Sequence, residues 1–325
     1  MDNLSVIRKP IEAELAEFIR LFNDSLQHSN GLLQKALDHV LQRGGKRMRP
    51  ILTLLIAKAL GEISHATYNA GIGLELLHTA SLVHDDVVDD AETRRGQASV
   101  NAEFQNKVAV LVGDYILSTA LIKVNQTGNL QIVDYLSHLG QTLSEGEILQ
   151  LSNISNEKIT EEVYYSIIKR KTAALFEACC AMGAMSVGAS EDRVGKVREF
   201  GQLVGIVFQI RDDIFDYYES SEIGKPTGND MAEGKLTLPA IHAILTTQDA
   251  GMTAIAYKVK ARTATADEIA RLVAFTKQNG GIEYAEQVMQ NNYDKALRMI
   301  GEIVTDSELR AALIAYLDFV IKRSN

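Results

Sequence analysis

Hydrophobic residues recur every three or four positions along most of this chain. That spacing places them on one face of an α-helix, and we find no convincing series of alternating strands or paired hairpin signals. The helices that the spacing predicts span 10–42 with an interruption near 23–30, 101–123, 130–151, 160–188, 190–218 and much of the chain beyond Pro239. The pattern therefore predicts an all-α protein.

Composition favours one large helical domain over two smaller ones. The 325 residues can bury a large core, aliphatic residues are frequent and Trp is absent. No proline occurs between Pro50 and Pro226, so nothing in that span forces a helix to end by the loss of an amide hydrogen. We expect a single domain over 1–325.

The C-terminal part of the chain carries helix-start signals but no candidate chemistry. Thr265 and Glu268 match a capping box, in which each side chain bonds the backbone N–H of the other residue, and so do Thr305 and Glu308. We assign this part to scaffold, and the motifs that could carry a function to about 40–240.

Charge and cysteine content narrow the class of ligand and the compartment. The formal net charge of −9 argues against general nucleic-acid binding, whereas local basic clusters suggest a small anionic ligand. The two cysteines, Cys179 and Cys180, are adjacent in a predicted buried helix, which favours core packing in a reducing compartment over a disulfide. Because no uncharged run reaches the roughly 20 residues of a membrane span and no signal peptide is evident, we expect a cytoplasmic protein without a membrane-spanning helix.

Four carboxylates in six positions end the helical run that begins at Gly73. Asp85 and Asp89 share a stripe with His78 and Ser81, so a carboxylate pair lies at the mouth of a face that becomes apolar further down. Like charges four residues apart repel each other, and a hard divalent cation with oxygen preference offsets that repulsion. The motif suggests Mg²⁺, although alone it is equally compatible with a solvated surface.

A second acidic motif favours the metal interpretation. Asp212, Asp213 and Asp216 repeat the Asp-Asp-x-x-Asp pattern at the end of another long apolar helix, within one arc that also holds Gln209. Two such helices facing each other would form a cavity with an acidic end. Mg²⁺ usually binds one or two carboxylates together with substrate phosphates, so the expected ligand is a diphosphate.

Basic residues accompany both acidic motifs. Lys46, Arg47 and Arg49 follow paired glycines, with Pro50 suited to the first turn of the next helix, and such a turn binds an oxyanion well. Arg94 and Arg95 lie in a turn that returns two guanidinium groups to the first carboxylates. A salt bridge to those carboxylates is the alternative, which we rank below a diphosphate held from both sides.

Two further stretches carry polar groups of interest. Lys171 and Thr172 precede small and apolar residues, an arrangement that can steady a cation without quenching it. The glycine-rich loop 222–235 is flanked by Lys225 and Lys235, which could close over bound phosphate as a lid. A surface loop without function is the alternative.

Six motifs in this order and spacing resemble the trans-prenyltransferases that make polyprenyl diphosphates, the long-chain octaprenyl type in particular. The motifs are Gly44-Gly45-Lys46-Arg47-Met48-Arg49-Pro50, Glu75-Leu76-Leu77-His78-Thr79-Ala80-Ser81-Leu82-Val83-His84-Asp85-Asp86-Val87-Val88-Asp89, Arg94-Arg95-Gly96, Lys171-Thr172-Ala173, Phe208-Gln209-Ile210-Arg211-Asp212-Asp213 and Gly234-Lys235-Leu236-Thr237-Leu238-Pro239. The resemblance implies about ten or more helices around a deep central cavity, usually in a homodimer. It also implies head-to-tail condensation of isopentenyl diphosphate with an allylic diphosphate such as farnesyl diphosphate, with about three Mg²⁺ ions per active site and a product that can be delivered to a membrane.

The resemblance also assigns roles to individual residues. The expected metal ligands are Asp85, Asp89 and Asp212, with Asp86, Asp213 and Asp216 in supporting roles at the metal site. The residues expected to hold isopentenyl diphosphate are Gly45, Lys46, Arg49, His78 and Arg95. Those expected to hold the allylic diphosphate are Arg94, Lys171, Lys225 and Lys235, and those expected to line the cation are Thr172 and Gln209.

Product length is expected to depend on the residues one turn below the first acidic motif. Each helical turn opens about 5 Å, comparable to one isoprene unit, so a bulky side chain there would stop growth early. Relatives that stop at fifteen carbons commonly have an aromatic residue in this region, whereas this chain has Ala80 and Ser81. We expect a product of about forty carbons. A shorter, geranylgeranyl product stays open as an alternative.

Three other classes of protein share part of this pattern. A terpene cyclase does not need a second diphosphate site, so Lys46, Arg49 and His78 argue against it. A non-catalytic partner subunit of a heteromeric synthase should lack one acidic motif, and this chain has both. A helical protein that only binds metal is the weakest alternative.

Overall fold

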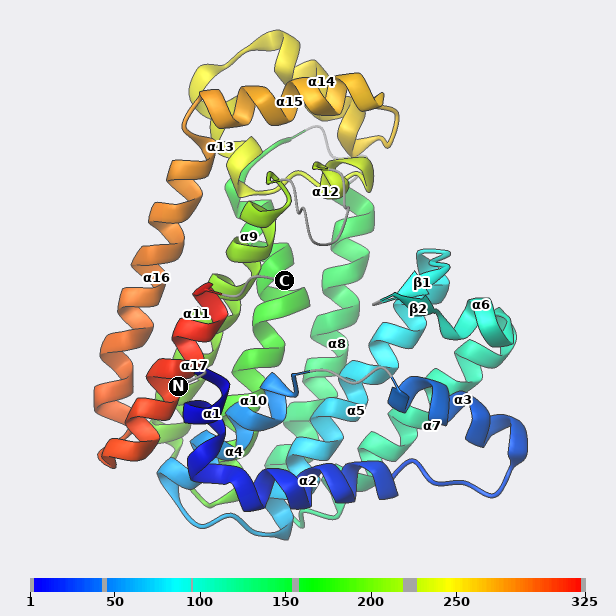
Figure 1. Ribbon diagram of the computed structural model, residues 1–325, viewed down its shortest axis with the longest axis vertical. Helices are drawn as coiled ribbons and strands as arrows, with labels where there is room; N and C mark the ends of the chain where they lie inside the picture. The colour runs from blue at the N-terminus through cyan, green and yellow to red at the C-terminus, as the bar shows by residue number, and fades with distance from the viewer. Residues whose placement is uncertain (1–2, 43–45, 95, 154–157, 219–226, 323–325) are drawn as a thin grey trace. The chain divides into compact units, whose positions relative to one another are not determined.

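The computed structural model describes residues 3–42, 46–94, 96–153, 158–218 and 227–322. Helices make up most of this part of the chain (Figure 1). The strands found in it are β1 (Thr93–Arg94) and β2 (Gln97–Ala98), which pair antiparallel in a short hairpin that the sequence pattern did not predict. The all-α prediction is confirmed.

Contacts along the chain group it into two compact units. Unit 1 comprises Met1–Gly140, Leu175–Gly201 and Met299–Tyr316. Unit 2 comprises Gln141–Ala174, Gln202–Arg298 and Leu317–Asn325. The single domain over 1–325 and its deep central cavity stay predictions, and each unit is described by itself below.

Unit 1 contains most of the N-terminal helices. Its complete helices are α1 (Asn3–Arg8), the 3₁₀ turn η1 (Lys9–Ile11), α2 (Glu12–Asp24), α3 (Gly31–Gln42), α4 (Met48–Leu60), α5 (His65–Val88), α6 (Val100–Phe104) and α7 (Asn106–Asn125). The interruption expected near 23–30 separates α2 from α3, and Pro50 lies in the first turn of α4 as predicted. The helix predicted over 101–123 is instead divided at Gln105, whose φ of 72° is not helical.

Close packing of α5 against α7 fixes the position of the first acidic motif. A Cβ atom on Gly73 of α5 would lie 2.5 Å from Cγ1 of Val124, and one on Gly113 of α7 would lie 2.2 Å from Nε2 of His84. Both distances are too short for a contact between atoms that are not bonded, so glycine at these positions is what allows the two helices to approach.

Helix α7 also meets the length and composition expected of a membrane span, the only helix in the described ranges that does. Core helices of soluble proteins meet the same criteria, and α7 packs along α5 with 33% of its apolar window buried. Other α7 side chains, such as Leu111 and Ile122, are exposed. Helix α7 does not contain an uncharged run of membrane-spanning length, because Lys107, Asp114 and Lys123 interrupt it.

Unit 2 contains the second half of the predicted chemistry. Its helical elements are α9 (Glu161–Ile168), the π-helical turn η3 (Lys169–Ala173), α12 (Asn229–Ala232), α13 (Leu238–Thr247), α14 (Ala250–Lys260) and α15 (Ala266–Gln278). Five further helices have residues in both units: α8 (Leu130–Ser152), α10 (Ala174–Ser186), α11 (Glu191–Phe215), α16 (Gly281–Ile303) and α17 (Ser307–Lys322).

Helix starts test the capping predictions directly. The hydroxyl of Thr160 accepts the backbone N–H of Val163 at the start of α9, as predicted. The capping box of Thr265 and Glu268 is present at α15. The box predicted at Thr305 is wrong, because α17 begins at Ser307 and the carboxylate of Asp306 accepts the backbone N–H of Leu309 at 2.8 Å.

Burial confirms the interpretation of the cysteines. Cys179 and Cys180 are both free thiols with no exposed surface, on α10. Burial raises the pKa of Cys179 to about 12, so the reactive thiolate is not populated at neutral pH.

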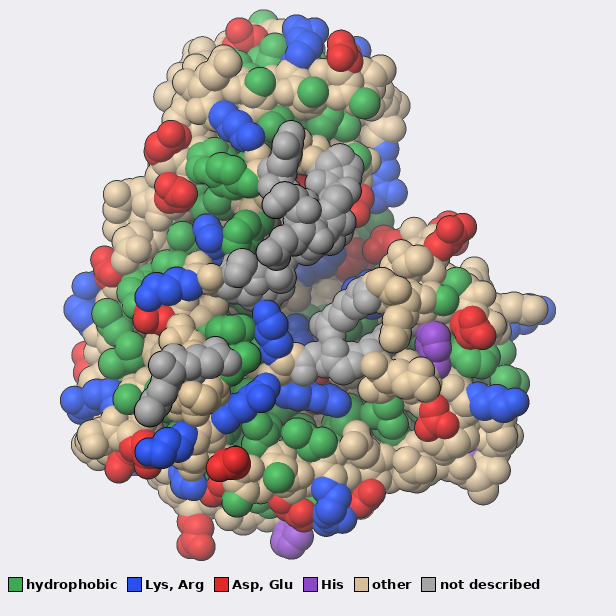
Figure 2. All heavy atoms as spheres, viewed as in Figure 1, with side chains coloured by type: hydrophobic (Ala, Val, Ile, Leu, Met, Phe, Trp, Pro, Cys, Tyr) green, Lys and Arg blue, Asp and Glu red, His purple; other side chains and the backbone are tan. Residues whose placement is uncertain are grey.

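The surface over α14 and α15 carries acidic and basic side chains interspersed with one another on the face drawn in Figure 2, as expected of scaffold.

Candidate active site

The first acidic motif lies at the C-terminal end of α5, in unit 1. Asp85 is in the last turn, and Asp89 is the first residue beyond the helix, with its backbone N–H bonded to the carbonyl of Asp85 at 2.8 Å. Asp85 is partly exposed and Asp89 is exposed. Two carboxylates therefore stand one turn apart at a solvent-accessible helix end, where negative charge is not favoured by the helix dipole.

Asp86 differs from its neighbours because it points inward. Its side chain has no exposed surface, and Nε of Arg94 donates to its Oδ1 at 2.5 Å. The β1–β2 hairpin carries Arg94 back to this point. The salt bridge ranked second from sequence is therefore present in the structure. It uses only Nε, so the NH₂ groups at the far end of the guanidinium are not used by this bond.

The basic turn places its cations differently. Lys46 is exposed, whereas Arg49 is partly buried in the first turn of α4 with its guanidinium 6.0 Å from the ring of Phe176. Nε of Arg49 and Oε2 of Glu75 are both buried without a hydrogen-bond partner. A buried donor of this kind is costly unless a ligand satisfies it, which fits an anion at this point. His78 follows Glu75 by three positions on α5 and is buried.

The residues expected to set product length lie on two sides of α5. Ala80 is buried, on the side that carries Gly73 and His84 toward α7. Ser81 is partly buried, on the stripe of Asp85, and its hydroxyl donates to the carbonyl of His78 at 2.9 Å. Both positions are small, as read from the sequence. Three other predicted residues, Gly45, Arg95 and Lys225, lie outside the described residues.

The second acidic motif lies at the C-terminal end of α11, in unit 2. Asp212 is partly buried in the last turn of the helix, and Asp216 follows the last helical residue. The two carboxylate oxygens of Asp216 accept the backbone N–H groups of Asn229 and Asp230 at 3.0 and 3.1 Å. Asp216 therefore anchors the start of α12 beside the end of α11, and its supporting role at the metal site stays a prediction.

Asp213 is the buried member of this motif. Oδ2 accepts the hydroxyl of Tyr164 at 2.5 Å, and Oδ1 accepts Nε2 of Gln209 at 2.8 Å. Burial, together with the negative charge of Asp230, raises the pKa of Asp213 to about 8. Burial likewise raises the pKa of Asp230 to about 6, with the charge of Asp216 as the second cause.

The π-helical turn η3 presents Lys171 and Thr172. Nζ of Lys171 lies 2.5 Å from Oε2 of Glu147 and 3.0 Å from Oε1 of Gln150, both on α8. A Cβ atom on Gly146 would lie 2.9 Å from Cγ of Lys171, so glycine there allows α8 to approach the turn. The hydroxyl of Thr172 donates to Oε1 of Gln209 at 2.7 Å. Single π-turns inside helices are frequent at functional sites.

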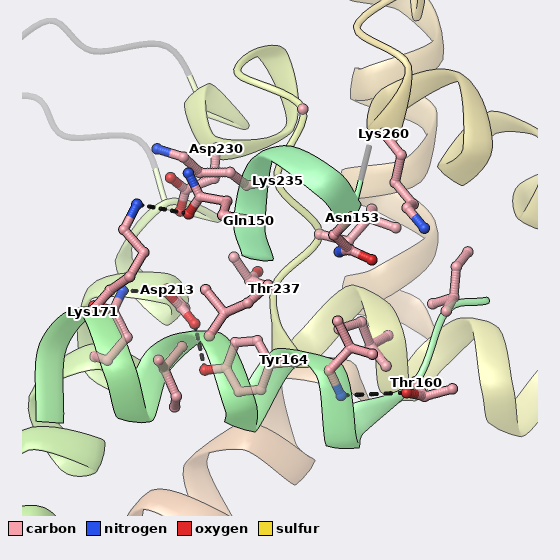
Figure 3. A pocket seen from close by; sticks show the side chains of 18 of the residues that line it. Gln150, Asn153, Thr160, Tyr164, Lys171, Asp213, Asp230, Lys235, Thr237 and Lys260 are labelled. Carbon is pink, nitrogen blue, oxygen red and sulfur yellow. Dashed lines mark hydrogen bonds between the residues drawn. The ribbon is translucent and has the colours of Figure 1, made fainter. Parts of the chain in front are cut away.

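These side chains border a cavity of about 200 Å³ within unit 2 (Figure 3). Its polar lining includes Lys171, Thr172, Gln209, Asp230 and Lys235. Its apolar lining consists of Ile159, Val163, Ile167, Ile168, Leu236 and Ile241. Lys235 projects toward this space from the segment after α12, and its Nζ lies 2.5 Å from Oε2 of Glu233. A hydrocarbon chain beside a polar head group is the kind of ligand that such a lining suits.

Sequence reasoning missed four contributors to this site. The sequence pattern gives Glu147, Gln150, Tyr164 and Asp230 no role. Tyr164 precedes Lys171 by seven residues, two helical turns, which was the available signal that both lie on one face. For Glu147 the one hint was the neighbouring Gly146 inside a long helix.

The donor atoms at both acidic motifs fit Mg²⁺ that a substrate helps to bind. Within the described ranges, no three His, Cys, Asp or Glu side chains gather closely enough to hold a metal by themselves. The available donors are carboxylate oxygens, which Mg²⁺ prefers, and it usually completes its coordination with water and substrate phosphates. The prediction that the two motifs share one ligand stays a prediction.

The chain is similar to known proteins over most of its length. The family model of polyprenyl synthetase matches residues 30–275. Octaprenyl diphosphate synthase of Haemophilus influenzae is 37% identical over 284 residues, which are 86% of this chain and 85% of that protein.

Solved structures show the same likeness. A geranylgeranyl pyrophosphate synthase from Bacteroides thetaiotaomicron is 50% identical, with a TM-score of 0.87 and coverage of 99% of this chain and 100% of that one. A polyprenyl synthase from Caulobacter crescentus CB15, complexed with calcium and isoprenyl diphosphate, is 29% identical with a TM-score of 0.89 and coverage of 98% of each chain. The chain therefore belongs to the polyprenyl synthetase family and is a trans-prenyl diphosphate synthase.

Proposed function

We propose that this enzyme condenses isopentenyl diphosphate head-to-tail with an allylic diphosphate such as farnesyl diphosphate and repeats the step to give a long all-trans product. The observation that carries the proposal is the grouping of Lys171, Thr172 and Gln209 at a cavity with an apolar wall. A cation for the leaving diphosphate and neutral oxygens for the carbocation are the two kinds of group that this reaction requires.

The proposed chemistry begins with loss of the allylic diphosphate. When bound, Mg²⁺ would stabilise the leaving diphosphate as a Lewis acid, and by the family resemblance Asp85, Asp89 and Asp212 would hold the metal. Lys171 and Lys235 place positive charge where the leaving group becomes more negative. Arg94 and Lys225 complete this set by the family resemblance.

The second part of the reaction joins the two substrates. Lys46, Arg49 and His78 hold isopentenyl diphosphate in the proposal, with Gly45 and Arg95, and its double bond attacks the allylic cation. The oxygens of Thr172 and Gln209 steady that cation while the isoleucines of the cavity wall exclude water. The released diphosphate then accepts the final proton, so no protein nucleophile is needed.

Metal dependence is part of the same proposal. The all-oxygen donor set favours Mg²⁺, with about three ions per active site by the family resemblance. The calcium and isoprenyl diphosphate bound to the Caulobacter crescentus protein support the use of a divalent cation with a diphosphate in this family.

Product length is proposed as about forty carbons, on the small side chains of Ala80 and Ser81. The likeness to the octaprenyl enzyme of Haemophilus influenzae supports this length. A second candidate is a geranylgeranyl product, which the 50% identity to the Bacteroides thetaiotaomicron enzyme favours. Both candidates share the chemistry above and differ only in where elongation ends.

A homodimer is also proposed, with the exposed face of α7 as its interface. Leu111 and Ile122 are 67% and 56% exposed on α7, and Leu130 at the start of α8 is 81% exposed. Several large apolar side chains exposed on one helix are a feature of protein–protein contacts, and a second copy of the chain would cover them. We expect Ile122→Glu to reduce the mass measured by light scattering, while Leu32→Glu, an exposed leucine on α3, leaves it unchanged.

One incubation tests the central proposal. Purified protein is mixed with farnesyl diphosphate, labelled isopentenyl diphosphate and Mg²⁺, and the products are separated by chain length. Products of about forty carbons are expected, twenty carbons would establish the second candidate, and a cyclised hydrocarbon or no product would overturn the proposed function. A cytoplasmic location, supported by the two buried free thiols, is a further expectation.

A further inference from the structure

Three hydrogen bonds join a buried tyrosine to the cavity wall, all within unit 2. The hydroxyl of Tyr164, on α9, donates to Oδ2 of Asp213. On the other side of that carboxylate, Nε2 of Gln209 donates to Oδ1, and the hydroxyl of Thr172 donates to Oε1 of Gln209. Figure 3 shows Tyr164 and Asp213, which both line the cavity, pointing toward one another.

The order of donors and acceptors along these hydrogen bonds is set by Asp213, which is buried. Oδ1 of Asp213, a side chain that is 2% exposed, accepts the NH₂ group of Gln209, and it can do so in the protonated as well as the ionised carboxyl because a carboxylic acid keeps one carbonyl oxygen. The amide oxygen of Gln209 then faces Thr172 and accepts the hydroxyl hydrogen. The lone pairs of the Thr172 oxygen, and not its hydrogen, are thereby left for the cavity.

That orientation matters for a carbocation. An oxygen lone pair stabilises a neighbouring positive charge, whereas a hydroxyl hydrogen pointing at it is repelled. A hydroxyl rotates freely unless a hydrogen bond holds it, and Gln209 could turn over by half a rotation if its anchor were lost. Preorganised dipoles of this kind act because they need no rearrangement as charge develops.

We propose that Tyr164 is a positioning residue, which acts through Asp213 and Gln209 to keep the Thr172 hydroxyl oriented with its lone pairs toward the allylic cation. The inference rests on the proposed function, because it requires that the cation form beside Thr172. Asp213 is then an anchor for this chain of hydrogen bonds and does not bind the metal.

The test compares two tyrosines that are adjacent on α9. Tyr164→Phe removes the first hydrogen bond, while Tyr165→Phe removes a hydroxyl of the same kind that has no place in the chain. The measurement is the single-turnover rate of the first condensation, with KM for each substrate. Tyr164→Phe should lower the rate about tenfold, the loss expected for one hydrogen bond, with both KM values within about twofold and Tyr165→Phe unaffected.

Two further variants separate positioning from a purely structural role. In a Thr172→Val background only the amide of Gln209 is left to orient, so adding Tyr164→Phe should cause a smaller loss of rate than it does in the wild-type protein. Asp213→Asn keeps one acceptor for Gln209 and a polar partner for Tyr164, so it should retain the rate within about threefold and leave the Mg²⁺ requirement unchanged.

Specific outcomes would overturn the inference. Equal rates for Tyr164→Phe and Tyr165→Phe would do so, as would a tenfold loss that persists in the Thr172→Val background. A raised Mg²⁺ requirement in Asp213→Asn would place Asp213 at the metal instead. If Tyr164→Phe fails to fold, Asp213→Ala takes its place, because it removes the shared acceptor of Tyr164 and Gln209, and an unchanged rate in that variant would overturn the inference. A wild-type protein without prenyl transfer would overturn the proposed function itself, which is a separate result.

Discussion

Arg94 and Asp86 form an ion pair in which the carboxylate is completely buried, with 2.5 Å between Nε and Oδ1. The two residues are eight positions apart, and the β1–β2 hairpin brings the arginine back over the end of α5. Asp86, the second carboxylate of the first acidic motif, therefore has a structural role in this pair. The first and last carboxylates, Asp85 and Asp89, are left for other partners.

Loss of Arg94 should therefore destabilise the protein. Arg94→Gln leaves a buried carboxylate without its cation, and we expect the free energy of unfolding to fall by about 2 kcal/mol, less than for a fully buried pair because Arg94 is 29% exposed. Denaturant unfolding measures this. Adding Asp86→Asn should restore most of the loss, and an unchanged midpoint in the single variant would contradict the structural role of the pair.

Asp85 should behave in the opposite way. Asp85→Asn removes a charge that repels Asp89, so we expect unchanged or higher thermal stability together with a loss of turnover of more than about 100-fold. Asp90→Asn is the matched control at the same helix end, because Asn tolerates the positive φ of 49° found there. Retained turnover in Asp85→Asn with a large fall in melting temperature would show that Asp85 is structural.

Lys171 combines a charge for the diphosphate with an ion pair to Glu147. Lys171→Met should lower turnover about 100-fold and should also cost about 1 kcal/mol of stability, because it leaves Glu147, which is 17% exposed, without its cation. Adding Glu147→Gln should restore stability but not turnover. Recovery of turnover in the double variant would mean that Lys171 only neutralises Glu147.

Product length tests the small residues of α5. Ala80→Phe and Ser81→Phe each place a ring one turn below Asp85, and we expect both to shorten the product while the first condensation continues. Products are measured by chromatography against standards of known chain length. If neither variant changes the length, the growing chain does not pass this part of α5.

The buried Asp213 predicts a pH dependence of stability in protein kept free of metal by a chelator. Burial raises its pKa from 3.8 to about 8 in the folded state, so folding favours the protonated form. Its contribution to stability is therefore complete below pH 3.8 and is lost as the pH rises to about 8. Melting temperatures should show Asp213→Asn gaining on the wild-type protein between about pH 5 and pH 8. Parallel curves would contradict the raised pKa.

Local pattern in the sequence determined much of this protein. Helical spacing predicted α2, α3, α8 and α11 closely, because burying one face of a helix demands apolar residues every three or four positions. The same reasoning located both acidic motifs at helix ends and the cysteines in the core. The motifs also pointed to the family, because their order and spacing are preserved over about 200 residues.

Tertiary structure alone decided which polar groups meet. The partners of Lys171 come from α8, and Tyr164 reaches Asp213 across 49 positions of the chain. The inward turn of Asp86 likewise depends on a hairpin only two residues deep on each side. Periodicity shows which face of a helix is buried but not which helix covers it, so hydrogen bonds between distant segments are set by packing and cannot be read from spacing.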